Sequence, residues 1–411
     1  MFAYPGRGVL GELSYICKEM ENLRIGYDAK RAMSNFTGLG NYSRLVLESY
    51  ARRFPSDSLL GFAPRLNGVN PRLEGIRGCT NVAFTTPQGI WRHMRSAWRS
   101  AGIAADIRKS GVDLFHGLSN ELPLNIRSCG IPSIVTIHDV IYRRMPECYT
   151  HIDRRLYDLK YGASCRNATR IVAISECTAR DIAEIYGIDP GKIEVIYQGC
   201  DDNFRRHITE AEINATLAEY RLPERYILQV GTVERRKNLE LTVRALAALP
   251  EDIKLVAAGR ATSYLDEVIY PLLDKLSLRG RFIHLPSVPF TKLPALDRGA
   301  AVIAYPSRYE GFGLPVIEGL ASRRPVVAAT GSCLEEAGGD AAIYVSPDDP
   351  RRLAEAIRHI LESPEDAAGM TARGAEYEKK FDNTQIPLRL RDLYLSLIHE
   401  HKKSLHDAGR K

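Results

Sequence analysis

Two glutamates, Glu310 and Glu318, are notable because they flank an apolar loop interrupted by glycines rather than a polar surface segment. Residues 305–318 read Tyr-Pro-Ser-Arg-Tyr-Glu-Gly-Phe-Gly-Leu-Pro-Val-Ile-Glu. The two glycines permit close approach of the backbone to a ligand, and Pro315 suits the first turn of a helix. We therefore expect both carboxylates to converge on one pocket, where Glu310 fixes hydroxyl groups and Glu318 accepts hydrogen bonds from a ribose diol.

A basic turn, Arg235-Arg236-Lys237, lies between a predicted strand and a predicted helix within residues 231–238. Cations are disfavoured near a helix N-terminus by the helix dipole, and an anionic ligand would relieve that conflict. Arginine offers a two-pronged donor and lysine a mobile point charge, which together suit a diphosphate. A solvated basic turn is the alternative interpretation.

The first half of the chain carries weaker signals. Gly38 and Gly40 precede a helix predicted over residues 41–54, so backbone N–H groups there could face an anion or a sugar, although a plain tight turn fits equally well. His138 and Asp139 end a predicted strand, where a histidine is placed for function, although a purely structural role is the commoner one for a lone histidine.

Short apolar runs alternate with segments of helix length, which predicts parallel sheets covered on both faces. In the first half the predicted strands are residues 23–28, 112–116, 133–139, 170–175 and 192–198. In the second half they are residues 226–232, 253–260, 281–288, 301–306, 325–330 and 341–345. This α/β pattern predicts a poorly ordered leader over residues 1–22, doubly wound domains over 23–203 and 204–384, and a terminal helix over 385–411 that crosses back to the first domain.

Composition excludes several classes of protein. The 411 residues are 45% apolar and 26% charged, as in an ordinary large globular protein, and they include no apolar stretch long enough to span a bilayer. The net charge is +6, of which residues 1–200 carry +7 and residues 201–411 carry −1, and the chain lacks the dense basic stripes of a nucleic-acid binder. The eight cysteines form no Cys-x-x-Cys pair and are typical of reduced thiols in a cytoplasmic protein.

The spacing of Glu310 and Glu318 in a Y-P-S-x-Y-E-G-F-G-L-P context resembles the E-x7-E signature of the family 4 retaining glycosyltransferases, which have the GT-B fold. The resemblance covers nearly everything from Leu23 to about Ser346. Its other parts are Gly231–Thr232 with Arg236–Asn238, Gly38–Tyr42, His138–Asp139, Ala173–Glu176, Val195–Gly199 and Ser332–Ala342. The G-T-x-E-x-R-K-N form is nearest to bacterial O-antigen mannosyltransferases.

The resemblance implies two Rossmann-like domains facing a cleft, with a nucleotide sugar held by the second. Gly231, Arg236 and Lys237 would then contact the diphosphate, and Glu318 the ribose. Many relatives have arginine directly after the glycine, where this chain has Thr232, which leaves Arg236 and Lys237 as the main phosphate cations.

The resemblance also implies contacts to the sugar. The second-domain residues that it places at the transferred sugar are Glu310, Phe312, Gly313 and Leu314. From the first domain, His138 would line the sugar side of the cleft and Gly40 the phosphate side. The implied activity is transfer of a hexose, mannose from GDP-mannose being favoured, to a glycan or lipid-linked glycan in cell-surface polysaccharide synthesis, with retention of configuration.

No Asp-x-Asp motif and no cluster of metal-ligating residues is present in the sequence, so we expect neither metal nor cofactor. The segment Ile90–Arg99 contains both tryptophans and three arginines at helical spacing. That pattern is typical of a helix at an anionic membrane surface, and equally of a helix that packs its aromatic face on the sheet.

The sequence leaves three other functions open and argues against a fourth. A UDP-sugar-dependent transferase is the main alternative, and a GT-B sugar-nucleotide epimerase or a catalytically silent nucleotide-sugar-binding protein are others. An NAD-dependent dehydrogenase would need a complete G-x-G-x-x-G directly after the first strand, which this chain lacks.

Overall fold

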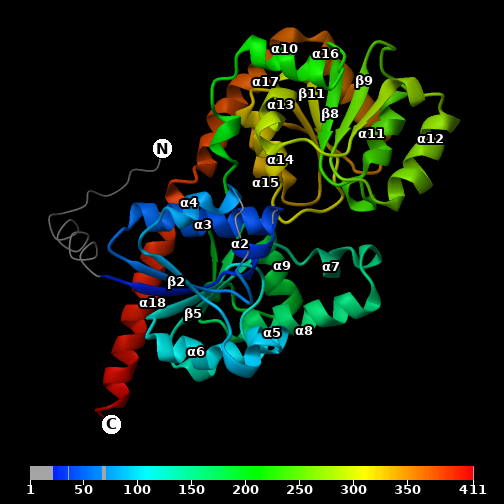
Figure 1. Cartoon of the computed structure of the whole chain (residues 1–411). Coiled ribbons are helices and arrows are strands. Elements are labelled where there is room, and N and C mark those ends of the chain that lie inside the picture. The colour runs from blue at the N-terminus through cyan, green and yellow to red at the C-terminus, as the bar shows by residue number, and fades with distance from the viewer. Residues whose placement is uncertain (1–21, 36, 67–70, 411) are drawn as a thin grey trace.

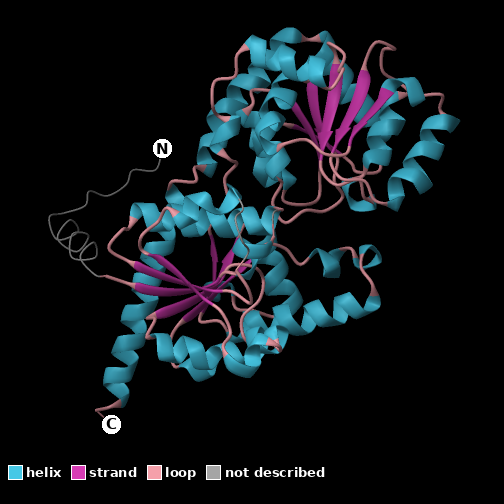
Figure 2. Ribbon diagram, in the orientation of Figure 1, coloured by secondary structure: helices cyan, strands magenta, loops and turns pink. Residues whose placement is uncertain are grey.

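The computed structural model describes residues 22–35, 37–66 and 71–410. The leader expected at residues 1–22 therefore lies, apart from Asn22, outside the described residues. Two α/β units stand one above the other in Figure 1, each with a sheet enclosed by helices, as Figure 2 shows by colour.

The first sheet has seven parallel strands in the order β3-β2-β1-β4-β5-β6-β7. Its strands are β1 (Arg24–Asp28), β2 (Ser58–Phe62), β3 (Val82–Thr85), β4 (Leu114–Gly117), β5 (Ser133–Ile137), β6 (Arg170–Ala173) and β7 (Ile193–Val195). The sequence patterns missed β2 and β3. Both are short, and no residue of β3 is fully buried because it forms the edge of the sheet, so their apolar signal is weak.

The second sheet has six parallel strands in the order β10-β9-β8-β11-β12-β13. Its strands are β8 (Tyr226–Val230), β9 (Lys254–Ala258), β10 (Phe282–Leu285), β11 (Val302–Tyr305), β12 (Val326–Ala329) and β13 (Ile343–Val345). All six fall within predicted ranges. The order of both sheets reverses at the first strand of each unit, so the carboxyl ends of β1 and β4, and of β8 and β11, open the crevices where such folds bind ligands.

Helices cover both faces of each sheet. In the first unit they are α2 (Lys30–Ser34), α3 (Gly38–Arg53), α4 (Glu74–Arg77), α5 (Arg95–Ala97), α6 (Ile103–Ser110), α7 (Ile141–Arg144), α8 (His151–Asn167) and α9 (Glu176–Tyr186). In the second they are α10 (Glu210–Glu219), α11 (Leu239–Leu246), α12 (Tyr270–Lys275), α13 (Leu293–Gly299), α14 (Leu314–Ala321), α15 (Leu334–Gly338), α16 (Pro350–Glu362) and α17 (Pro364–Tyr377).

The last helix, α18 (Gln385–Ala408), returns to the first unit and packs on α3, so the predicted crossing is present (Figure 1). Its Arg391 lies 3.4 Å from the buried carboxylate of Asp57. Its Tyr394 hydroxyl lies 2.7 Å from His116 Nδ1 and 3.2 Å from the Tyr27 hydroxyl. These polar contacts among buried side chains fix how the helix sits on the sheet.

The single amphipathic helix expected over Ile90–Arg99 is not formed. The chain instead makes a 3₁₀ turn (Gly89–Arg92), the short α5 and a π turn (Trp98–Gly102). Trp98 is fully buried and donates its indole N–H to Asp106 at 2.6 Å, whereas Ile90 and Met94 are exposed. The two tryptophans do not share an exposed face, because Trp98 fills the core beneath the sheet.

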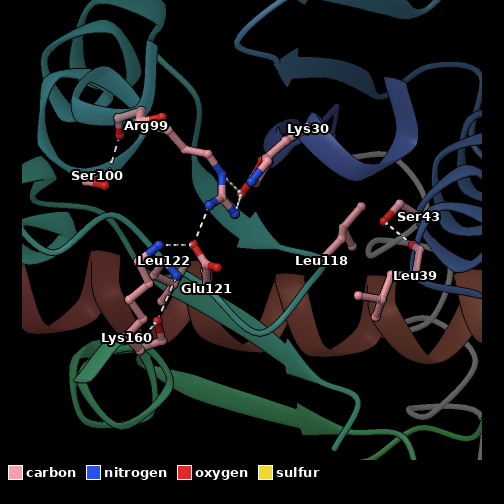
Figure 3. Close-up of polar contacts among 12 residues, drawn as sticks. Lys30, Leu39, Ser43, Arg99, Ser100, Leu118, Glu121, Leu122 and Lys160 are labelled. Atoms are coloured by element: carbon pink, nitrogen blue, oxygen red, sulfur yellow. Dashed lines mark hydrogen bonds and ion pairs between the residues drawn. The ribbon is translucent and has the colours of Figure 1, made fainter. Parts of the chain in front are cut away.

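Arg99 likewise points inward rather than to solvent. Its guanidinium forms ion pairs with Asp28 at 2.5 Å and with Glu121, and Figure 3 shows it directed toward Glu121 with Lys160 on the far side of that carboxylate. Burial opposes its charge, but Asp28 and Glu121 together raise the pKa of Arg99. Arg99 therefore supports the carboxyl ends of β1 and β4 and is not part of a surface stripe.

Candidate active site

The basic turn follows β8 through Gly231, whose φ of 140° is a conformation that other residues rarely adopt. Arg235–Lys237 form one 3₁₀ turn, and Asn238 begins α11 with a left-handed φ of 58°. The amide of Asn238 donates to the Pro306 carbonyl at 3.0 Å and the Pro347 carbonyl at 2.8 Å. The turn is thereby tied to the loops that follow β11 and β13.

The loop after β11 is bonded to the same turn. The N–H of Arg308 donates to the Arg236 carbonyl at 2.9 Å, and the Ser307 hydroxyl oxygen lies 3.2 Å from the same carbonyl. The guanidinium of Arg236 returns a bond to the Tyr309 carbonyl at 2.9 Å. The basic turn and the loop after β11, the two segments singled out in the sequence, are thus hydrogen-bonded to each other at the carboxyl ends of β8 and β11.

The carboxylate of Glu310 is surrounded by charged and hydroxyl groups from these two segments. It is buried, and one carboxylate oxygen lies 2.7 Å from both Arg236 Nη1 and Lys237 Nζ. The hydroxyls of Ser307 and Tyr305 donate to the same oxygen at 2.5 and 3.1 Å. Burial works against the charge of Glu310, but Lys237 and Arg236 lower its pKa to about 2, so it is anionic at neutral pH.

Glu318 has a different environment. It lies in α14, whose first turn contains Pro315 as expected, and it lines a cavity of about 310 Å³ between the two units. Its carboxylate has no hydrogen-bond partner among the described residues. Desolvation, with a contribution from the Asp201 carboxylate, raises the pKa of Glu318 to about 7. A carboxyl group of this kind is available to a ligand.

The expectation that both glutamates open into one pocket is thus met by Glu318 alone. Glu310 does not line the cavity; its buried carboxylate is stable because cations and hydroxyl groups surround it. Leu314 lines the cavity, whereas Phe312 does not. Phe312 stacks on Tyr197 with ring centroids 5.9 Å apart, and Gly313 adopts a φ of 117° beside Leu334.

The first unit closes the cavity with α3 and the segment after β7. Residues from this side that line it are Gly38, Asn41, Arg44, Leu45, Glu48, Arg72, Gln198, Gly199, Cys200 and Asp201. Helix α3 begins at Gly38, so the expected glycine loop is its first turn. Gly40 is not among the lining residues, because its N–H donates to the Asn35 side chain at 3.2 Å and any Cβ there would meet the Asn35 carbonyl at 1.7 Å.

His138 follows β5 and faces the second unit through its backbone. Its N–H donates to Asn120 Oδ1 at 2.7 Å, and its ring Nε2 donates to the Leu118 carbonyl at 2.9 Å, which leaves Nδ1 as the accepting nitrogen. Burial lowers the pKa of His138 to about 4, so the ring is neutral at physiological pH. Its carbonyl would lie 2.1 Å from a Cβ at Gly311.

Direct hydrogen bonds join the two units at the Glu310 loop. The hydroxyls of Ser175 and Thr178 donate to the Gly311 carbonyl at 2.7 and 3.0 Å, and the Tyr309 hydroxyl donates to Asp181 at 2.8 Å. Glu336 of α15 accepts the first N–H groups of α9 at 2.7 and 3.2 Å. The loop that holds Glu310 therefore also holds the units together.

Sequence patterns singled out the cavity residues Gly38, Asn41, Gln198 and Gly199, but not Arg44, Leu45, Glu48, Arg72 and Cys200, nor the contacts of Tyr309 and Glu336. No local signal marks the latter, because their role arises only where two distant segments meet. In the described part of the chain, no three side chains of the metal-binding types are grouped to hold an ion, and no helix is long and apolar enough to cross a membrane. The seven cysteines there are free thiols.

Comparisons with known proteins agree with this geometry. Residues 46–204 match the family model described as Glycosyltransferase Family 4, and residues 217–377 match that of Glycosyl transferases group 1. The chain belongs to the family 4 glycosyltransferases, and its fold is GT-B. It is a glycosyltransferase, and mannosyltransferases are among its relatives.

One such relative is the O-antigen chain mannosyltransferase B of Escherichia coli, 28% identical over 361 residues that span 84% of this chain and 92% of that protein. Among solved structures, Anabaena HepE in complex with UDP has a TM-score of 0.72 at 18% identity, covering 92% of this chain and all of that one. WaaG, a glycosyltransferase of lipopolysaccharide biosynthesis, has a TM-score of 0.67 at 17% identity, covering 90% of this chain and 99% of that one.

Proposed function

We propose that this protein transfers mannose from GDP-mannose, with retention of configuration, to a glycan or lipid-linked glycan acceptor in cell-surface polysaccharide synthesis on the cytoplasmic side of the membrane. The observation that carries the proposal is the pairing of Glu310 with Arg236 and Lys237 beside a cavity lined by Glu318. The mannose donor is favoured by the O-antigen mannosyltransferase relative.

The site has the charges that this chemistry requires. As the bond from sugar to phosphate breaks, negative charge grows on the diphosphate and positive charge on the sugar. Arg236 and Lys237 stabilise the first, and the anionic Glu310 that holds them opposes excess positive charge and fixes their direction. Glu318 accepts hydrogen bonds from the ribose, and neutral His138 accepts one from the sugar through Nδ1.

Transfer in this proposal uses no metal ion, since two cations already face the diphosphate. Retention follows from a same-face displacement in which the departing phosphate accepts the proton of the acceptor hydroxyl. Closure of the two units excludes water and limits hydrolysis of the donor.

A UDP-sugar donor is the second candidate, because Anabaena HepE binds UDP in a similar fold. A thermal-shift screen with GDP-mannose, GDP, UDP-glucose and UDP separates the two. A donor at 100 times its dissociation constant stabilises the protein by about 2.7 kcal/mol, and we expect this from GDP-mannose. If only the UDP ligands raised the unfolding temperature, the donor would be a UDP-sugar and not GDP-mannose. If none of the four ligands raised it, the proposed donor site would be rejected.

Two measurements test the chemistry. NMR of the product distinguishes retention from inversion, and a product of inverted configuration would contradict the mechanism. Transfer in EDTA should stay within about twofold of the untreated rate, whereas loss of activity that Mg²⁺ or Mn²⁺ restores would show that the two cations do not suffice.

The variant Lys237→Ala should weaken donor binding, and Arg225→Ala, at an exposed ion pair far from the cavity, serves as the matched control.

A further inference from the structure

An open hollow of about 350 Å³ lies at the carboxyl ends of β2 and β3 and shares no lining residue with the cavity that contains Glu318. Three exposed arginines line it, Arg65 after β2 and Arg92 and Arg95 after β3, together with Gln88 and other uncharged residues of the same two loops. No aspartate or glutamate is among its lining residues. The hollow therefore presents positive charge without an opposing carboxylate.

Two of the three guanidinium groups are held in place by uncharged partners. Arg92 donates to the side-chain oxygen of Gln88 at 2.7 Å, and Arg95 Nε donates to the Arg92 carbonyl at 3.1 Å. Their other N–H groups, and all those of the Arg65 side chain, have no hydrogen-bond or ion-pair partner within the described part of the chain. Arginine presents such groups in a planar fork that matches the oxygens of a phosphate.

The hollow lies on the same edge of the first sheet as His138. All seven strands are parallel, so the loops after β3, β2, β1, β4 and β5 follow one another along this edge. Lys30 and Arg31 follow β1, are partly buried, and have no ion-pair partner for their cations among the described residues. Lys30 lies beside Arg99 in Figure 3, and the charge of Arg31 contributes, after burial, to the lowered pKa of His138. Cations thus extend from the hollow to His138.

The position of the hollow indicates which substrate it serves. The donor diphosphate is assigned to Arg236 and Lys237 of the second unit, so an anion bound on the first unit belongs to the acceptor. Three strand spacings, about 15 Å, separate β2 from β5. An acceptor that places its reacting hydroxyl at His138 and an anionic group in the hollow is therefore longer than a single sugar.

We propose that the hollow formed by Arg65, Arg92 and Arg95 binds a phosphate or diphosphate group at the far end of an oligosaccharide acceptor. The inference rests on the proposed function, whose acceptor it narrows to a saccharide that carries phosphate. It also separates the arginines of the segment Ile90–Arg99, because Arg92 and Arg95 line the hollow while Arg99 is paired inside the protein.

The test is isothermal titration calorimetry of the full chain at constant ionic strength. GDP is present in excess, so that Arg236 and Lys237 are occupied. The titrants are inorganic pyrophosphate, mannotriose 1-phosphate and mannotriose. The first tests the hollow for a bare phosphate group, and the other two measure what a phosphate adds to a saccharide.

Two variants remove the same amount of charge from different surfaces. The hollow variant changes the three lining arginines, and the matched control changes three arginines that are likewise exposed but belong to other elements. The hollow variant is Arg65→Gln/Arg92→Gln/Arg95→Gln, and the control is Arg155→Gln/Arg221→Gln/Arg323→Gln.

We expect wild type to bind pyrophosphate and the hollow variant to bind it at least about tenfold more weakly, while the control stays within about twofold. Mannotriose 1-phosphate should bind wild type at least about tenfold more tightly than mannotriose does, and this gain should be absent in the hollow variant. Thermal unfolding at the wild-type temperature establishes that both variants are folded, as expected for exposed positions.

Three results would overturn the proposal: no binding of pyrophosphate to wild type, an equal loss in the control, or binding of pyrophosphate in the hollow with no gain from the phosphate of the saccharide. The last would assign the hollow to a free phosphate ion in place of the acceptor. The hollow variant keeps Arg236 and Lys237, and the titrations need no transfer. Failure here is therefore distinguishable from failure of the proposed transferase activity.

Discussion

At the scale of single residues, the two glutamates of the E-x7-E segment differ in their protonation behaviour. Glu310 has its pKa lowered to about 2, whereas that of Glu318 is raised to about 7. The ammonium group of Lys237 forms an ion pair with Glu310, whereas it acts on Glu318 only through a longer-range electrostatic interaction. The same residue type at two positions of one loop is thereby given two roles, one in holding cations and one in receiving a ligand.

Replacing Glu310 with Gln should lower kcat about 100-fold with a smaller rise in donor KM, because Glu310 fixes the direction of Arg236 and Lys237, which stabilise the charge that grows on the departing diphosphate. It should also destabilise the fold by about 2–3 kcal/mol, because Arg236 and Lys237 lose a buried counter-charge. Steady-state kinetics and urea unfolding measure the two effects. The control is Glu234→Gln, which removes the more exposed partner of Arg236; equal losses in both variants would refute the assignment.

Replacing Glu318 with Gln should raise donor KM more than it lowers kcat, since the ribose does not change during the reaction. In wild type the donor kcat/KM should rise with pH through about 7 as Glu318 ionises, and this inflection should vanish in the variant. His138 cannot supply it, because its pKa is about 4. A persisting inflection near pH 7 in Glu318→Gln would assign it to another group.

Folding stability should depend on pH in the opposite direction to kcat/KM, falling as the pH rises. The folded-state pKa of Glu318 lies above its unfolded value, so the folded state binds the proton more tightly and loses stability as pH rises from about 4.5 to about 7. Above that range Glu318→Gln should therefore be more stable than wild type, by about 1–2 kcal/mol after allowance for its partial exposure. Binding would then be weakened while folding is improved.

At the scale of elements, α18 is anchored by a buried ion pair. Asp57 accepts from the Leu23 N–H at 3.1 Å and the Tyr50 hydroxyl at 2.9 Å, and it faces Arg391 of α18. Asp57→Ala should cost about 3 kcal/mol, because the buried guanidinium of Arg391 loses the opposite charge of the Asp57 carboxylate. Amide exchange along α18 should accelerate in this variant. Arg389→Ala, two residues away at an exposed pair with Glu194, should change stability by less than about 0.5 kcal/mol, and equal costs would contradict the role given to Asp57.

At the scale of the whole molecule, Gly311 sets how closely the two units approach. A Cβ there would lie 2.1 Å from the His138 carbonyl and 2.9 Å from Asp139 Cβ. Gly311→Ala should therefore force the units apart and lower kcat by at least about 100-fold, because groups on both units must meet the substrate. Donor affinity by calorimetry should fall much less, since the cations and Glu318 belong to the second unit. Gly280→Ala, with open space around it, is the control, and unchanged activity in Gly311→Ala would refute the contact.

The sequence by itself determined the class of the fold, the place of Pro315 in the first turn of α14, and the segments that carry the site, because these depend on residues close together in the chain. Apolar runs separated by helix lengths specify strands of a parallel sheet, and a glycine loop before a helix specifies a ligand-facing turn. The edge strand β3 escaped detection because its partly exposed residues have no clear period, and β2, although it lies inside the sheet, is only five residues long.

Only the tertiary structure decided what each of these residues touches. It buried Glu310 against Arg236 and Lys237 and left Glu318 in the cavity. It also packed Gly40 against Asn35 and broke the segment Ile90–Arg99 so that Trp98 enters the core. Desolvation and ion pairing depend on neighbours that lie far away in the sequence, so local spacing identified the reactive groups but not their charges or partners.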